Sequence, residues 1–391
     1  MPAKVLLTVD SALKSYLEVV EYMKISILTC FVGLIGLCVQ SIAVANIMTV
    51  RENLERTGNP PSESDRNTID AFWQRTLDTM LISEESAEVV AYRRQIQRAR
   101  GTDPTSPYTT AYIQIGKDHL QAAFRAVQRE EDPKHRTLMR RNLMILTAQL
   151  KSPHLAEFGL DRLDDQDEVV RYWAVKTVAG RAIAMQLADQ AGDNSALTES
   201  ILDALRQRVE NESDIQILRV IVNFAAMVNH DKARQILLAT AERRKNAYMN
   251  WQVDHERFDA DLLNIMGQIL IEQEPSEARS MMARRFAELL SLVFQRYMAE
   301  PSPLTTTQRD ALVGIIAKIE NQVLNQVMGQ QTPFVRIIQR GGAGLEREVE
   351  AFFGSDAGAG HLASRLEFNY GQTADGRPIH TPPQLPAPPE R

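Results

Sequence analysis

The residues best placed to do chemistry lie around position 255, where one histidine and three acids fall close together. His255 and Asp259 are four positions apart, a spacing that puts two side chains on one face of a helix. Such a pair could act as an acid and a base, or supply two ligands to a metal ion. Two ligands do not make a metal site, and Phe258 begins an apolar stripe on the same segment. We therefore expect His255, Asp259 and their neighbours Asp254 and Glu256 to lie on a solvated polar face.

A second group of acids could offer oxygen ligands to a calcium ion. Its members are Asp161, Asp164, Asp165, Asp167 and Glu168. The group lacks the central glycine and the spacing of a helix-loop-helix calcium site. Acids in this position also cap a following helix and complement its positive end. We expect that capping role and no metal.

Common catalytic motifs are missing from the sequence, including HExxH, GxSxG, GxGxxG and the phosphate-binding loop that ends in Lys-Ser/Thr. The glycine-rich run 341–344 follows no strand-like segment, so we interpret it as a hinge or linker. The remaining histidines are dispersed: His119, His135, His154, His230, His361 and His380. We expect no enzymatic activity, and we assign no catalytic, cofactor-binding or metal-binding residue.

Basic residues concentrate in the run 93–100 and in Arg243-Arg244-Lys245. Either run could contact acidic lipid or protein, but a solvated helix face is the simpler interpretation. The run 93–100 has no interleaved aromatic residues that could stack on bases. The formal net charge is −6, from 44 basic and 50 acidic residues. We therefore expect no nucleic-acid partner.

The N-terminal part of the chain determines the expected compartment. No charged residue occurs from position 25 to 50, and both cysteines, Cys30 and Cys38, lie there. One interpretation is a signal peptide over 23–45 that begins at Met23 and ends at the cleavage site Ala43-Val44-Ala45. Residues 1–22 would then precede the true start of the protein. A second is a retained membrane anchor over 25–47, and a third is a buried core helix. The first two interpretations place the rest of the chain outside the cytoplasm, in the periplasm, secreted or anchored to the membrane.

The rest of the chain is typical of an all-α protein, because residues that favour helices are abundant and aromatic residues are sparse. We expect a linker and capping helices over 46–108, followed by five helix pairs over 109–329. Asp132-Pro133 should begin one of these helices, and a capping box from Thr305 to Gln308 should begin another. Residues 330–391, rich in glycine and proline, should form a largely disordered tail with one short helix near 346–353.

Two segments of the body match at an offset of 48 residues, 167–171 and 215–219. Residues at this offset share one apolar stripe, from Val170 to Val178 in the first copy and from Leu218 to Ala226 in the second. A period near this value is typical of arrays of helix pairs. Such pairs bury their apolar stripes by stacking on each other.

The segment 163–174 resembles the turn and second helix of a HEAT repeat, with Asp164, Val170, Arg171 and Ala174 at the positions typical of that family. The resemblance implies an α-solenoid of stacked antiparallel helix pairs. It also implies that Arg171 and Arg219 pair with acidic residues of neighbouring repeats. The second copy has Val222 where the first has Ala174, so it fits the pattern less well.

These observations favour an exported scaffold or adaptor that binds another protein on the concave face of a solenoid. A membrane-anchored version of the same module is the first alternative. An all-α enzyme that uses acids and His255 is the second.

Overall fold

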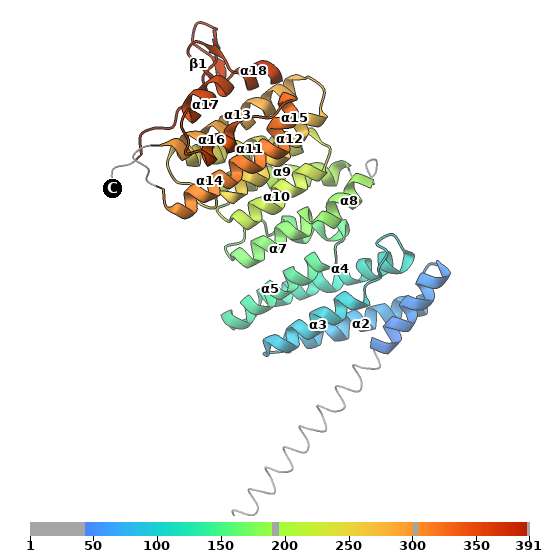
Figure 1. Ribbon diagram of the computed structural model, residues 1–391. Coiled ribbons are helices and arrows are strands. Elements are labelled where there is room, and N and C mark those ends of the chain that lie inside the picture. The colour runs from blue at the N-terminus through green and yellow to red at the C-terminus, as the bar shows by residue number, and fades with distance from the viewer. Residues whose placement is uncertain (1–43, 190–194, 300–303, 389–391) are drawn as a thin grey trace, which may run out of the picture. The chain divides into compact units, whose positions relative to one another are not determined.

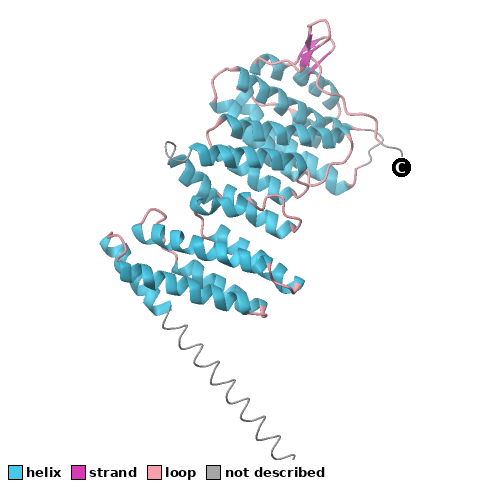
Figure 2. Ribbon diagram, turned by 180° about the vertical axis from the view of Figure 1, so that it is seen from behind, coloured by secondary structure: helices cyan, strands magenta, loops and turns pink. Residues whose placement is uncertain are grey.

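The computed structural model describes residues 44–189, 195–299 and 304–388. Regular structure in these residues is almost entirely helical, and the strands form two small hairpins close to the C-terminal helices (Figure 1, Figure 2). The all-α prediction is confirmed. The chain divides into two compact units, Met1–Leu155 and Ala156–Arg391. The array predicted over 109–329 therefore spans the boundary between two units, with its first helix pair in unit 1.

Unit 1 consists of antiparallel helices joined by short turns. After helical residues 44–57 come α2 (Glu63–Ile82), α3 (Ser86–Ala99), α4 (Pro107–Gln128), α5 (Pro133–Gln149) and the short 3₁₀-helix η1 (Pro153–Leu155). Helix α2 packs on α3 and α4, and α5 packs on both α3 and α4. Asp132 caps α5 with Pro133 in its first turn, as the sequence predicts.

The core of unit 1 is built on Trp73, which is fully buried. Its indole N–H donates to the carbonyl oxygen of Tyr112 at 3.1 Å, and the Tyr112 hydroxyl donates to that of Ile96 at 2.7 Å. A Cβ atom added at Gly116 would lie 2.3 Å from Trp73 Cζ2. Only glycine at this position lets α4 approach the indole so closely.

The residues before Gly58 belong to unit 1. Ile47 and Leu54 are buried, and the Arg51 guanidinium donates to the carbonyl oxygen of Arg98 at 2.8 Å. A packed helix therefore precedes the turn at 58–62, within the stretch 46–108 for which a linker and capping helices are predicted. The predicted signal peptide or anchor falls almost wholly outside the described residues. Among those that are described, no helix has the length and apolarity to cross a bilayer.

Unit 2 contains the remaining elements. They are α6 (Ala156–Leu160), α7 (Glu168–Ala179), α8 (Arg181–Asp189), α9 (Ser195–Asn211), α10 (Ile215–Met227), α11 (Asp231–Met249), α12 (Arg257–Glu272), α13 (Glu277–Met298), α14 (Thr306–Ile319), the π-helix η2 (Glu320–Leu324), α15 (Asn325–Met328), α16 (Phe334–Gln339), α17 (Leu345–Phe353), β1 (Gly354–Ser355), β2 (Gly358–Ala359), α18 (His361–Leu366), β3 (Gly371–Gln372) and β4 (Pro378–Ile379). Strands β1 and β2 pair antiparallel, as do β3 and β4.

Helices α7 to α14 form two rows. Helices α9, α11 and α13 contact each other in that order, and α7, α10, α12 and α14 do the same alongside them. Between the rows, α10 and α12 contact α11, and α12 and α14 contact α13. Figure 1 shows these helices stacked from α7 towards the red C-terminal helices. The apolar stripes predicted for α10, α12 and α13 are largely buried between the rows.

The C-terminal region is ordered over 330–388, and the prediction of a largely disordered tail is wrong. Phe334, Phe352 and Phe353 are buried. Phe334 and Phe353 pack against Phe294 of α13, and Phe352 packs edge-on against both of them, with ring centroids 4.8 to 5.6 Å apart. Glu320 stabilises the start of α16, because its carboxylate accepts hydrogen bonds from the backbone amides of Phe334 at 2.9 Å and Val335 at 2.7 Å. These aromatic contacts order a segment whose composition alone indicates a coil. The predicted short helix over 346–353 is present as α17.

Candidate functional site

The acids and the histidine around position 255 are separated by the fold. His255 is exposed and precedes α12, with a left-handed φ of 57°. Asp259 is fully buried, and its carboxylate accepts hydrogen bonds from Arg244 Nε at 2.6 Å and Nη2 at 3.0 Å. The Tyr248 hydroxyl donates to the same carboxylate at 2.9 Å. The prediction of a solvated polar face is therefore wrong for Asp259.

This buried cluster joins α11 to α12. Burial acts to lower the pKa of Arg244, but the charge and hydrogen bonds of Asp259 outweigh it and raise the pKa. Burial, together with the Asp259 charge, also raises the pKa of Tyr248. Glu256 is buried as well and lies 3.4 Å from the guanidinium of buried Arg296. With three donors already on its carboxylate, Asp259 serves to connect helices and is poorly placed to accept a substrate proton.

The second basic run is engaged within unit 2. Arg243 donates to the carbonyl oxygen of Val209 at 2.6 Å, and Lys245 lies 2.8 Å from Glu242. Arg244 belongs to the buried cluster. This run therefore offers no basic patch to acidic lipid.

In unit 1, the basic run of α3 is divided between two environments. Arg93 is half-buried and donates to the Asn142 side chain of α5 at 2.5 Å, and burial lowers its pKa. Burial also lowers the pKa of half-buried Arg100. Arg94 and Arg98 are exposed. Part of the run packs inside the unit, and only part of it forms the solvated face that the sequence predicts.

The acidic group at 161–168 caps α7, as predicted. Asp167 accepts the amide of Val169 at 2.9 Å and is the N-cap of the helix. Asp164 lies 2.8 Å from Arg208 of α9. Within the described residues, no group of three or more histidines, cysteines and acids is arranged to hold a metal ion.

Arg171 and Arg219 each pair with an acid that lies later in the chain. Arg171 lies 3.3 Å from Glu212, whose carboxylate also accepts from Arg208 at 2.9 Å. Burial acts to raise the pKa of Glu212, but hydrogen bonds from the Asp214 amide and the two arginines lower it overall. Arg219 of α10 lies 3.4 Å from Asp261 of α12.

An open groove runs beside this second ion pair across three helices. Its volume is about 560 Å³, and it is lined by α10, α12 and α14. Asp261 is part of the lining and lies 3.4 Å from Arg219 and 2.9 Å from Lys318 of α14. Arg257 and Asp310 also line the groove and are exposed. The groove thus presents both signs of charge on a surface that water reaches.

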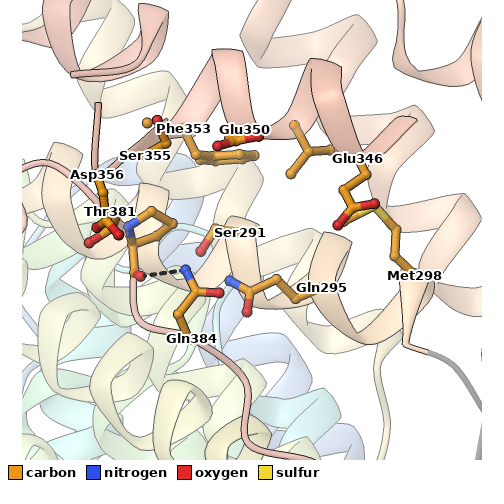
Figure 3. Close-up of a pocket in the computed structure, with 13 residues that line it drawn as sticks. Ser291, Gln295, Met298, Glu346, Glu350, Phe353, Ser355, Asp356, Thr381 and Gln384 are labelled. Carbon is orange, nitrogen blue, oxygen red and sulfur yellow. Dashed lines mark hydrogen bonds between the residues drawn. The ribbon is translucent and has the colours of Figure 1, made fainter. Parts of the chain in front are cut away.

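A second hollow, of about 360 Å³, lies at the C-terminal end of unit 2. Figure 3 shows its three sides: Ser291 and Gln295 from α13, Glu346, Glu350 and Phe353 from α17, and Thr381 and Gln384 from the final segment. The Ser291 hydroxyl is occupied, since it donates to the carbonyl oxygen of Glu288 at 3.0 Å. The hollow is therefore a polar cleft bordered by the proline-rich tail.

Sequence reasoning missed the contact between this tail and the helical body. The Trp251 indole donates to the carbonyl oxygen of Pro386 at 3.0 Å, and Gln295 contacts both Pro383 and Leu385. Trp251 and Pro386 are 135 positions apart, and no periodic signal connects them. The sequence feature that could have indicated this contact is the recurrence of tail prolines every third residue, at 383, 386 and 389.

Comparison with known proteins identifies no relative: no family model, curated protein or solved structure matches the chain.

Proposed function

We propose that the protein is a binding module without enzymatic activity, whose second unit holds another protein on the face formed by α10, α12 and α14. The groove shared by these three helices is the observation that supports this most. It is open and extended, and its charged side chains come from successive helices. A surface of this kind suits an extended or helical protein segment that carries both signs of charge.

The two rows of unit 2 support the further proposal of a HEAT-like α-solenoid. In such an array each helix pair contacts its neighbours, and the binding surface is made by equivalent helices of successive pairs. The contacts along α7, α10, α12 and α14 fit this pattern. The ion pairs of Arg171 and Arg219 also fit it. The face of α10, α12 and α14 is our candidate for the concave surface.

We also propose that this module works outside the cytoplasm, either exported or anchored. Ile47 is fully buried, two positions after the small-residue site at 43–45. Cleavage after Ala45 would thus release a chain whose second residue, Ile47, is buried in unit 1. N-terminal sequencing of protein from fractionated cells would distinguish the alternatives: a start at Asn46 in the soluble envelope fraction supports export, and an intact N-terminus in membranes supports an anchor.

A photo-crosslinking residue placed in the groove would test the proposed binding face. Gly314 is suitable, because nothing lies within 4 Å of a Cβ atom added there. Gln207, which is exposed on α9 of the other row, is the matched control. In native cells we expect a discrete crosslinked adduct from position 314 and none from 207.

Charge reversal in the groove supplies the second control. Lys318→Glu should abolish the adduct from position 314 without changing the thermal unfolding midpoint by more than the effect of a surface substitution. An equal yield from positions 314 and 207, or an adduct that is insensitive to Lys318→Glu, would rule out this face as the binding surface.

A further inference from the structure

The final segment of the chain lies on the helical body and is held there through its backbone. Gln295 Nε2 donates to the carbonyl oxygen of Pro383 at 2.9 Å, and Gln295 Oε1 accepts the amide of Leu385 at 2.6 Å. The Trp251 indole donates to the carbonyl oxygen of Pro386 at 3.0 Å. Two side chains of the body thus bind three polar groups of the tail backbone between Pro383 and Pro386.

These contacts suit a proline-rich segment better than an arbitrary peptide. The tail prolines recur at 383, 386 and 389, which is the Pro-x-x-Pro spacing. A polyproline helix has three residues per turn and no internal hydrogen bonds, so prolines at this spacing share a face and the carbonyl groups stay available. Leu385 supplies the amide that a proline there could not. Aromatic grooves recognise such segments in other contexts by the same physical means.

The end of α11 places Trp251. The residue directly follows the C-cap of that helix and has a left-handed φ of 57°. Its amide donates to the carbonyl oxygen of Tyr248 at 3.0 Å, and the Gln252 amide donates to that of Ala247 at 2.9 Å, which is the hydrogen-bond pattern of a Schellman cap. The turn that ends the helix therefore holds the residue whose indole N–H donates to the Pro386 carbonyl.

The tail itself is a surface strap. Gln384, Pro386 and Ala387 are exposed, while Pro382 is buried at the point where the strap leaves the body. A segment tied to its own binding site has a high effective concentration there, so a separate peptide competes with it at a disadvantage.

We propose that Trp251 and Gln295 form a docking site for Pro-x-x-Pro segments of another protein, and that the chain's own tail occupies this site in an autoinhibitory manner. A partner's segment binds by displacing residues 383–388. The site lies apart from the groove on α10, α12 and α14, so this inference holds or fails independently of the function proposed above.

A synthetic copy of Thr381–Pro389 with a fluorescent label is the probe. Its binding is measured by anisotropy to the full chain and to a chain that ends at Pro382. We expect at least tenfold tighter binding to the shortened chain, because the competing tail is gone. The matched control peptide carries Leu385→Pro, which stays proline-rich but lacks the amide that Gln295 accepts, and it should bind at least tenfold more weakly.

Two variants of the shortened chain identify the site. Trp251→Gly keeps a residue suited to the left-handed conformation, so the fold is preserved while the indole donor is lost. Gln295→Leu removes both polar atoms at similar size. Each should weaken binding at least tenfold. Equal binding of the probe to the full and shortened chains, or to Trp251→Gly and its parent, would overturn the proposal.

A measurement on the full chain covers the case in which the shortened chain fails to fold. Hydrogen exchange of the Leu385 amide should be slow in the parent and at least tenfold faster in Trp251→Gly, while α13 stays protected. Excess unlabelled probe should also accelerate it. Exchange that is equally fast in the parent and the variant would refute the docked tail. Dimers that dissociate on adding the probe would show that the tail of a second copy is the occupant, which contradicts autoinhibition within one chain.

Discussion

Substitution of Asp259 should reveal how much the buried connection between α11 and α12 contributes to unit 2. The Asp259 side chain is 0% exposed and that of Arg244 is 9% exposed. Asp259→Ala leaves the buried Arg244 charge without its carboxylate partner, with the Asp254 carbonyl oxygen still accepting from it at 3.0 Å, and removes the acceptor of the Tyr248 hydroxyl. Removing one partner of a buried ion pair costs about 3–5 kcal/mol. We expect the free energy of unfolding of unit 2 to fall by that amount.

Arg219→Ala is the matched control, since it breaks an ion pair between α10 and α12 at the surface. The side chains of Arg219 and Asp261 are 36% and 38% exposed, and Asp261 retains Lys318 as a partner. Exposed pairs contribute about 0.2–1 kcal/mol. The two substitutions should therefore differ severalfold in effect, although both remove one ion pair between helices.

Urea unfolding followed by far-UV circular dichroism gives the stability change. Hydrogen exchange of amides in α11 and α12 assigns that change to unit 2, which matters because a chain of two units need not unfold in one step. A further variant, Asp259→Leu with Arg244→Met, should recover much of the loss, since apolar replacement of both partners is often nearly neutral. If Asp259→Ala cost no more than Arg219→Ala, the assignment of a buried, stabilising ion pair would be refuted.

Three further predictions concern other close contacts. Gly116→Ala should lower the thermal unfolding midpoint of unit 1, because the added Cβ would lie 2.3 Å from an indole atom. Gly314→Ala, whose Cβ would have nothing within 4 Å, should raise stability by up to about 1 kcal/mol. A stabilising Gly116→Ala together with a destabilising Gly314→Ala would contradict the packing. Glu212→Gln should lower the urea midpoint at pH 7. Because the folded pKa of Glu212 is lowered, its contribution is complete above the unfolded value of about 4.3 and is lost as the pH falls through the lower folded pKa, so parent and variant should converge once the carboxyl is protonated in both states. Glu320→Ala should speed hydrogen exchange at Phe334 and Val335, whose amides it accepts, and a rate unchanged from the parent would show that they have another acceptor.

Local signals predicted the helices well, because the residues that determine them are close in sequence. The box of Thr305 and Gln308 caps α14 through both expected hydrogen bonds. Asp167 caps α7, and the stripe that begins at Phe258 is buried in α12. Each of these features depends on side chains within a few positions of the backbone groups that they serve.

Contacts between distant segments were beyond the same reasoning. Asp259 follows the apolar Phe258 directly, and periodicity alone assigned it to the solvated side. Its burial depends on Arg244, which lies 15 positions earlier on a different helix. The C-terminal region is a similar case, since its phenylalanines are scattered among glycines and their shared partner Phe294 belongs to α13. Composition and periodicity report local preferences, whereas contacts between distant segments determine the structure at Asp259 and in the C-terminal region.

The environment of each charge also indicates which parts of unit 2 can take part in binding. A partner that approached the Arg244–Asp259 pair would have to open the core and expose a charge whose neutralisation is essential for stability. The Arg219, Asp261 and Lys318 side chains are partly solvated, and their mutual attraction is worth little in water. Exchanging these weak pairs for contacts with a partner costs little free energy. This contrast between weak, partly solvated pairs and the buried Arg244–Asp259 pair supports the proposal that the groove of α10, α12 and α14 is the binding face.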